Sequence, residues 1–249
     1  NCSSIMKRSN ISDPNSLIGK NLAIHPAAPV TAMFDEPLYS WKGGICGSYS
    51  EEFAKDENAS YFMEPGSVGP ALIGSIIPGF GRAHRDIMAK FLHLASSNSI
   101  IHDKGIGTVS YDASTHRAVI DYKLDDETAK LAKDSIKNMA RAWFAAGAKA
   151  VMTPFTKPLV LESLEDLDKV DLMSTEPNDL MLVSYHPQST VRMGGDEQNS
   201  IINSQGECHH TKGLYVVDAS TFPTSVHVNP QISVMSIAMH FAKQLINKI

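Results

Sequence analysis

The sequence has few cysteines, no excess of basic residues and no long apolar run. Its 249 residues include three cysteines, Cys2, Cys46 and Cys208, too few and too scattered for a disulfide framework, so we expect reduced thiols and a cytoplasmic setting. The 22 Lys and Arg against 27 Asp and Glu give a formal net charge of -5, which argues against nucleic acid as the main partner because phosphate binding needs a cationic surface. The roughly eighteen consecutive apolar residues of a transmembrane helix do not occur.

The opening of the chain also lacks the features of a translation start. It begins with Asn1 rather than Met, and no basic segment followed by an apolar core opens it. We therefore expect no signal peptide, and we expect the chain either to have lost its start or to be a piece of a longer protein.

Apolar periodicity indicates both strands and helices. The spacing predicts helices over residues 81–97, 125–146 and 161–170 and from 230 onward, with Asp125 as N-cap and Gly147 as terminator of the second. Alternating or short apolar runs predict strands over residues 30–34, 43–49, 60–63, 99–102, 107–111, 118–124, 180–184 and 214–217. The links among 99–124 are too short for helical crossovers and predict an antiparallel meander.

These elements predict an α+β fold, with an antiparallel sheet and helices in the middle of the chain. The two ends are typical of a separate α/β unit, so we divide the chain into 1–26, 27–183 and 184–249.

Two loops near the C-terminus carry the residues best suited to chemistry. His186 follows an apolar strand and precedes a loop with Ser, Thr and two Gly, a place where reactive groups are often displayed; a structural histidine is the alternative. Further on, a buried strand ends in Asp218, and Asn229 stands where it would cap the last helix. A helix N-terminus suits an anionic or electron-rich cofactor edge, although an ordinary capped surface helix fits equally.

Four motifs in order resemble the C-terminal region of the glucose–methanol–choline (GMC) flavin oxidoreductases, above all the long-chain alcohol oxidase and dehydrogenase branch. The resemblance covers nearly the whole chain. The motifs are Ile18–Leu22 with His25-Pro26, His186–Thr190 with Arg192-Met193-Gly194, Gly213–Ser220, and Asn229-Pro230.

The resemblance implies an FAD enzyme that transfers a hydride from an alcohol carbon to flavin N5. By match of motif, His186 is the general base and Asn229 holds the same substrate oxygen. A histidine suits this role because its pKa lies near neutral, and an amide donates a hydrogen bond to a developing alkoxide without titrating. Asp218, Ala219, Asn229, Pro230 and Gln231 would approach the flavin. In these terms residues 1–26 and 184–249 belong to the FAD-binding domain and 27–183 form the substrate-binding domain.

The chain departs from the family pattern in the turn after His186. Gln188-Ser189 stands where the family usually has a Gly before Thr190. Ser189 would restrict the backbone if that position needs a positive φ. In the early motif, Ile24 stands where the family usually has Asp before His-Pro.

A larger departure is the lack of the G-x-G-x-x-G fingerprint that binds the ADP half of FAD in this family. The chain therefore resembles only the C-terminal part of such an enzyme, with the N-terminal FAD-binding half on the same or another chain, and the isolated piece is expected to be inactive. The alternative is a non-catalytic lobe that binds a partner through a bare apolar surface.

Other candidate residues favour structural roles or leave the choice open. Cys208, His209 and His210 are adjacent, and adjacent ligands rarely converge on zinc, so no metal is expected. We expect His25 to be structural, whereas His227 fits either role. The apolar stretch 70–78 indicates either an apolar alcohol substrate or simply core. An oxidase and a dehydrogenase remain equally open.

Overall fold

The computed structural model describes residues 2–54, 60–103 and 107–247 and divides into two units. Unit 1 consists of residues 1–25, 102–123 and 184–249, and unit 2 consists of residues 26–101 and 124–183. The expected division after residues 26 and 183 into domains of different roles stays a prediction. Residues 102–123, which we expected in the substrate-binding domain, cluster with unit 1.

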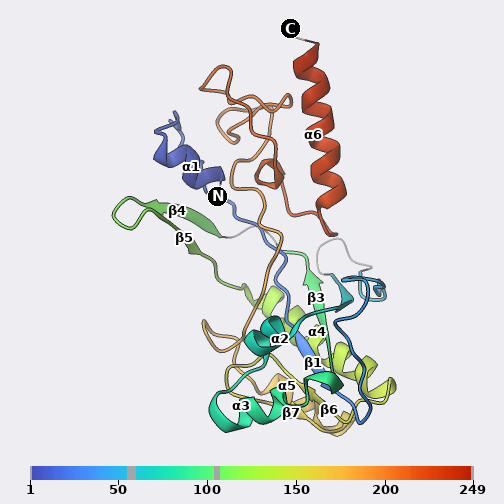
Figure 1. The fold of residues 1–249 in the computed structure, drawn as a ribbon. Coiled ribbons are helices and arrows are strands. Elements are labelled where there is room, and N and C mark those ends of the chain that lie inside the picture. Colours follow the sequence, from blue (N-terminus) through green and yellow to red (C-terminus); the bar gives the residue numbers. More distant parts are fainter. Residues whose placement is uncertain (1, 55–59, 104–106, 248–249) are drawn as a thin grey trace. The chain divides into compact units, whose positions relative to one another are not determined.

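Unit 2 is built on a five-stranded antiparallel sheet (Figure 1). In spatial order its strands are β2 (Tyr61–Gly66), β3 (Leu94–Ile101), β1 (Val30–Met33), β6 (Ala150–Met152) and β7 (Val160–Leu161). The central strand β1 places Thr31 opposite Ser96 on one side and Met152 on the other. Strands 30–34 and 60–63 of the sequence prediction are confirmed with small shifts of their ends.

Helix α4 (Asp126–Ala145) covers this sheet and contacts β3, β1, β2 and β6. Its first turn is capped as the sequence predicted, because the Asp125 carboxylate accepts a hydrogen bond from Thr128 N at 2.6 Å. At the other end Gly147 adopts a φ of +97°, a left-handed conformation that ends the helix. The inward face of α4 buries Ile136 and Met139 in the main core.

The remaining helices of unit 2 are short. They are α2 (Pro70–Ile76), α3 (Gly81–Met88), the 3-10 turns η1 (Phe91–His93) and η2 (Leu164–Leu167), and α5 (Asp168–Asp171). Residues 94–97, expected in a helix, instead open β3, because pairing with β1 and β2 satisfies their backbone groups. Ile73, Ile76 and Ile77 are buried in a second apolar cluster with Leu94 and Met152, so the apolar stretch 70–78 contributes core.

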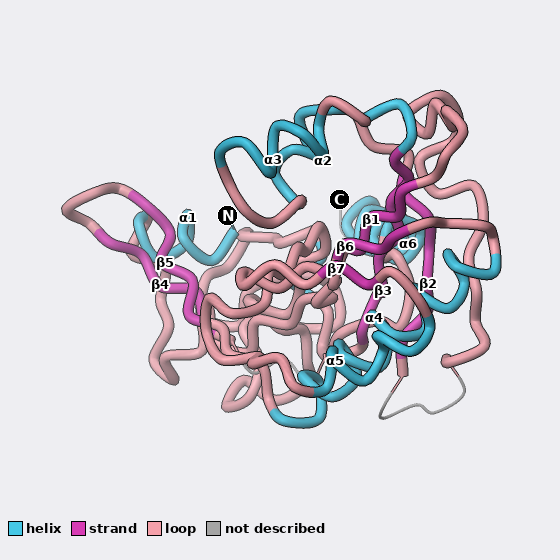
Figure 2. Tube along the Cα trace, turned by 90° about the horizontal axis from the view of Figure 1, so that it is seen from below, coloured by secondary structure: helices cyan, strands magenta, loops and turns pink. Residues whose placement is uncertain are grey.

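Unit 1 has little regular structure, and much of it runs as loops (Figure 2). Its elements are α1 (Cys2–Arg8), β4 (Thr108–Asp112), β5 (Arg117–Asp121), the 3-10 turn η3 (Ala219–Thr221) and α6 (Gln231–Ile246). The hairpin β4–β5 and the last helix are confirmed. Residues 99–102 do not continue into a meander, because β3 pairs with β1 and β2 while β4 and β5 form a two-stranded sheet of their own. Unit 1 holds the hairpin through hydrogen bonds such as Val109 N to Gly19 O at 2.7 Å.

Three expected strands are not regular strands. Residues 43–49 form turns and bends, and 180–184 and 214–217 make only isolated bridges, such as Leu180 to Phe155 and Tyr215 to Glu207. Leu180 and Val216 are buried within these loops, whereas residues 43–49 are exposed. The mixture of helices and antiparallel sheets confirms the α+β class. Among the described residues, no helix combines the length and apolarity that crossing a bilayer requires.

Candidate functional site

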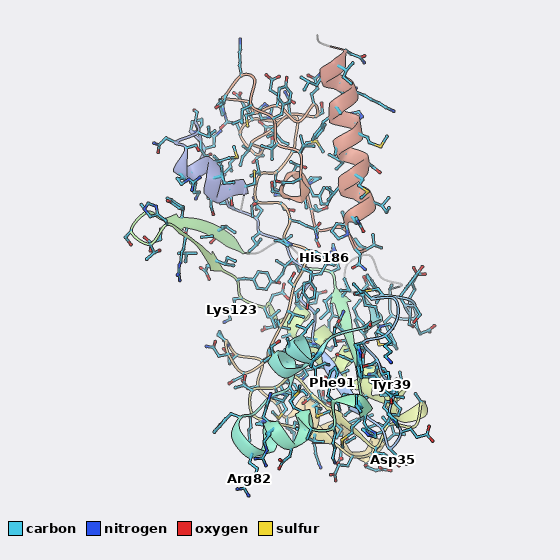
Figure 3. The ribbon with its side chains drawn as sticks, in the orientation of Figure 1. Asp35, Tyr39, Arg82, Phe91, Lys123 and His186 are labelled. Atoms are coloured by element: carbon cyan, nitrogen blue, oxygen red, sulfur yellow. The ribbon has the colours of Figure 1, made fainter. Side chains whose placement is uncertain are left out.

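His186 (labelled in Figure 3) lies in the segment 186–191, which we call the histidine turn. Backbone hydrogen bonds connect this turn to two other segments of unit 1. Gln188 N donates to Ala23 O at 2.8 Å, which joins the turn to the early motif. Ser189 N donates to Ala219 O at 3.2 Å and Val191 N to Ser220 O at 2.8 Å. Segments that are far apart in the sequence therefore meet at this turn.

The departure at Ser189 has a structural consequence. Its φ is +68°, in the left-handed region that favours glycine. The position therefore needs a positive φ, and this chain adopts it with a serine whose side chain is buried.

His25 contacts His186 directly. The two Nδ1 atoms lie 3.1 Å apart, and the rings meet edge to face with their centroids 5.1 Å apart. His25 is 1% exposed, and its Nε2 also contacts the carbonyl oxygen of Val226. Burial disfavours the charged form and lowers the pKa of His25 from 6.5 to about 4. We expected a structural role for His25, and the sequence carried no signal of its contact with His186.

Gln188, which precedes Ser189, contacts His25, His186 and Val226. It is fully buried. Its Nε2 donates to His186 O at 3.2 Å, and its Oε1 accepts from Val226 N at 3.1 Å. One amide thus joins the loop of His186 to the loop that leads to the last helix, a role that the sequence analysis did not predict.

A second pair of histidines lies near His25. The rings of His102 and His227 are stacked, with their centroids 3.6 Å apart. Both contribute charge effects that lower the pKa of His25. The neighbouring Asp103 accepts hydrogen bonds from Ile24 N at 2.9 Å and from the Tyr122 hydroxyl at 3.0 Å.

Two of the expected cofactor residues, Asp218 and Ala219, line a cavity of about 550 Å³. Asp218 is the N-cap of η3, because its carboxylate accepts from Ser220 N at 2.7 Å. The same cavity is lined by Pro187 and Thr190 of the histidine turn. The two C-terminal motifs therefore share one cavity within unit 1.

The other three expected site residues form the approach to α6. Asn229 and Gln231 are exposed and Pro230 is buried. Asn229 does not hold the N-cap position as we expected: Pro230 occupies it and makes no side-chain capping hydrogen bond. These three residues do not line the 550 Å³ cavity. Asn229 lies three residues after Val226, whose carbonyl oxygen contacts His25. The Cα atoms of Val226 and Asn229 are therefore at most about 11 Å apart.

The remaining histidine candidate has ordinary partners. His209 Nε2 lies 3.0 Å from the Ser200 hydroxyl and 3.1 Å from Gly194 O. Within the described part of the chain, no group of three His, Cys, Asp or Glu side chains is arranged to hold a metal ion.

Unit 1 offers two chemical features: an imidazole that can transfer a proton and main-chain hydrogen-bond donors at the start of α6. A half-buried imidazole, His186, is held by a neutral one. The first turn of α6 presents backbone N–H groups that have no intrahelical acceptor. Such a combination suits an electron-rich ring edge together with a substrate hydroxyl.

Residues 104–238 match a family model described as GMC oxidoreductase. Among curated proteins, an uncharacterized GMC-type oxidoreductase of Mycobacterium tuberculosis is 31% identical over 233 residues, which cover 93% of this chain and 36% of that protein. The long-chain-alcohol oxidase FAO4A of Arabidopsis thaliana is 31% identical over 253 residues, which cover 94% of this chain and 34% of that protein. The chain thus spans about a third of the length of these relatives.

Two solved structures share the fold. A pyridoxine 4-oxidase from Mesorbium loti matches with a TM-score of 0.60 and 18% identity, covering 93% of this chain and 43% of that one. A formate oxidase matches with a TM-score of 0.59 and 13% identity, covering 92% of this chain and 47% of that one. At this level of identity the likeness concerns the fold alone.

Proposed function

This chain belongs to the GMC oxidoreductase family, and from that premise we propose that it forms the substrate-binding and C-terminal part of an FAD-dependent enzyme that oxidises the CH–OH group of a small-molecule alcohol. The observation that carries the proposal is the contact between His186 and His25. It holds an imidazole in a defined orientation within the motif where the family places its base.

The residues present fit the isoalloxazine end of a flavin. The N-terminus of α6, where Pro230 makes no side-chain cap, supplies main-chain donors, and such donors suit the pyrimidine edge of the ring. Asp218 and Ala219 line the 550 Å³ cavity of unit 1. The sequence contains no G-x-G-x-x-G fingerprint for the ADP half, so that half is assigned to polypeptide outside this chain.

The protein side of the reaction needs a base and a hydrogen-bond donor for the alcohol oxygen. His186 takes the hydroxyl proton at its Nε2, and the amide of Asn229 donates a hydrogen bond to the same oxygen. A bound flavin supplies the hydride acceptor at N5. The neutral His25 beside His186 adds no positive charge at neutral pH, since its pKa is lowered to about 4.

The partner surface of unit 1 is apolar. On β5, Val119 and Ile120 are 48% and 66% exposed, and on α6, Ile232 and Met239 are 72% and 62% exposed. Exposed apolar patches of this kind mark interaction surfaces. Because the chain spans about a third of its relatives, we assign this surface to contact with the FAD-binding half, on the same or another chain.

The proposed substrate is an alcohol with an apolar body. The support is the similarity to the long-chain-alcohol oxidases of Arabidopsis thaliana. Residues 70–78 no longer add support, because Ile73, Ile76 and Ile77 are core residues.

The experiment is to express the full gene product and follow flavin bleaching by long-chain alcohols without oxygen. We expect a flavin absorbance band and its loss on mixing with alcohol. His186→Ala should lower the reduction rate by about 10²–10⁴-fold. His209→Ala, which removes a histidine bonded to Ser200 and Gly194, is the matched control and should leave the rate near the wild-type value. An unchanged rate in His186→Ala would show that the base is another group.

The second candidate is a non-catalytic lobe that binds a partner through the same apolar surface. The exposed apolar side chains of β5 and α6 support this non-catalytic lobe as well as they support contact with an FAD-binding half. The colour of the purified gene product separates the two: a yellow protein that alcohol bleaches supports the enzyme, and a colourless protein that requires a partner supports the lobe.

A further inference from the structure

The contact between His25 and Val226 fixes which nitrogen of His25 carries the proton. A carbonyl oxygen only accepts hydrogen bonds, so the facing Nε2 must donate. A neutral imidazole has a single N–H, and burial keeps His25 neutral at pH 7 by lowering its pKa to about 4. The lone pair of His25 is therefore on Nδ1.

This assignment in turn fixes the proton on His186. The Nδ1 atoms of the two rings lie 3.1 Å apart. Because the His25 Nδ1 accepts, the His186 Nδ1 must carry a proton and donate it. In neutral His186 the lone pair is then on Nε2, the nitrogen that would take a proton from a substrate.

Gln188 binds the N–H of Val226, the residue whose carbonyl begins this chain of hydrogen bonds. Its Oε1 accepts from Val226 N at 3.1 Å, and its Nε2 donates to His186 O at 3.2 Å. The Gln188 Nε2 also lies 3.2 Å from the His25 Nε2. Both atoms are donors in this tautomer, so that approach is a contact rather than a hydrogen bond.

We propose that His25 is a positioning residue for His186, and that Gln188 and the main-chain carbonyl of Val226 hold His25 in the tautomer this role requires. The inference rests on the proposed function, because it deepens the role of His186 as base. We call the hydrogen-bonded series of Val226 O, His25 and His186 the relay. It differs from a carboxylate–histidine pair because the group that accepts from the His186 imidazole, His25, is neutral. The titratable groups facing it in unit 1 are His102 and His227, which affect His25 electrostatically, and Asp103, which holds the backbone of the adjacent Ile24.

The decisive variants remove or keep the acceptor that faces His186. In His25→Leu the acceptor is lost, and the limiting rate of flavin reduction in the full-length holoenzyme should fall about 10–10²-fold, the range typical of outer partners that orient a histidine ligand. Alcohol binding should change little. His25→Gln can donate to Val226 O and accept from His186, so it should recover most of the lost rate. His209→Leu is the control for loss of a histidine elsewhere in unit 1.

The pH profile separates positioning from mere support of the fold. His25→Leu should move the pH at which the base titrates in the reduction rate, while His25→Gln and His209→Leu should leave it in place. A His25→Leu enzyme with an unaltered rate and profile would overturn the proposal.

A readout independent of activity is the ¹⁵N spectrum of histidine-labelled protein. We expect His186 to carry its proton on Nδ1 in the wild type and to lose that preference in His25→Leu. A wild-type His186 protonated on Nε2 instead would overturn the relay, whatever the activity. Nδ1 protonation in a protein that no alcohol reduces would support the relay and contradict the proposed function.

Discussion

The two units of this chain are stabilised in different ways. Unit 2 encloses a large apolar cluster between a five-stranded sheet and α4, so regular backbone pairing and burial act together. Unit 1 has a smaller cluster and one two-stranded hairpin. Its segments are joined by isolated bridges and by side chains such as Gln188 and Asp103 that bond to backbone groups.

The candidate site lies in the less regular unit. All five residues of β5 are exposed, and α6 buries only Phe241 among its described residues. The predicted site residues, His186 among them, are in unit 1. Loops can bring distant segments to one point, whereas a sheet fixes its side chains by register. Polar contacts therefore position the segments of unit 1, whereas apolar packing positions those of unit 2.

The largest expected effect tests whether burial is concentrated in unit 2. Phe155 is fully buried in its core, and Phe155→Ala should cost about 3–5 kcal/mol of unfolding free energy. Met239 on α6 is 62% exposed, and Met239→Ala should change the free energy by less than about 0.5 kcal/mol. Urea unfolding of the purified protein measures both. Equal losses would mean that α6 is packed as tightly as the core.

The next prediction concerns acid stability in unit 1. The folded-state pKa of His25 is lowered from 6.5 to about 4, so between these values the unfolded chain binds a proton that the folded one does not. The contribution of His25 is complete above pH 6.5 and is lost as the pH falls toward 4, by about 3 kcal/mol. Unfolding free energies measured from pH 8 to 4 should show this slope, and His25→Gln should remove it. Retention of the slope in that variant would assign it to other groups.

A smaller effect is expected at the capped helix of unit 2. Asp125→Ala removes the acceptor for Thr128 N and should cost about 0.5–2 kcal/mol. Asp125→Ser keeps a capping oxygen and should recover most of that loss. Asp126→Ala, which removes only a first-turn charge, should cost less than about 1 kcal/mol. Thermal unfolding can rank the three, and a larger loss in Asp126→Ala would contradict the capping role.

The smallest effect is expected in the histidine turn. Ser189→Gly relieves a serine held at φ +68°, which costs about 1–2 kcal/mol for a residue with a Cβ, and the flexibility of glycine in the unfolded chain offsets part of the gain. We expect a net gain of about 0.5–1 kcal/mol in chemical denaturation. Ser189→Val should lose stability instead. A loss in Ser189→Gly would mean that the serine side chain contributes more than its backbone strain costs.

Sequence reasoning located the elements whose signals are local. The helix from Asp126 to Ala145 was predicted to within a residue because its cap, its apolar stripe and Gly147 all lie in one continuous segment. The hairpin β4–β5 was found for the same reason. The helix expected over 81–97 was too long, because residues 94–97 pair with strands that lie far away in the sequence.

In the candidate site, too, the sequence predicted the residue with a local signal and missed its distant partners. His186 was found by its motif, whereas the partners that orient it were not. His25 is 161 residues away, and His25 and Val226 are separated by 201 residues. Gln188 was noted only as an unusual residue, and its contacts with Val226 N and His186 O depend on where two loops meet.

By itself, the sequence determined the α+β class, the family resemblance and the histidine at the centre of the candidate site, because each is recorded in short continuous patterns of residue type. Only the tertiary structure decided that His25 is a neighbour of His186, that residues 102–123 belong with the two ends of the chain, and that Ser189 needs a positive φ. The physical reason is that hydrogen-bond partners and tautomers are fixed by the approach of groups distant along the chain, and periodicity does not record that approach.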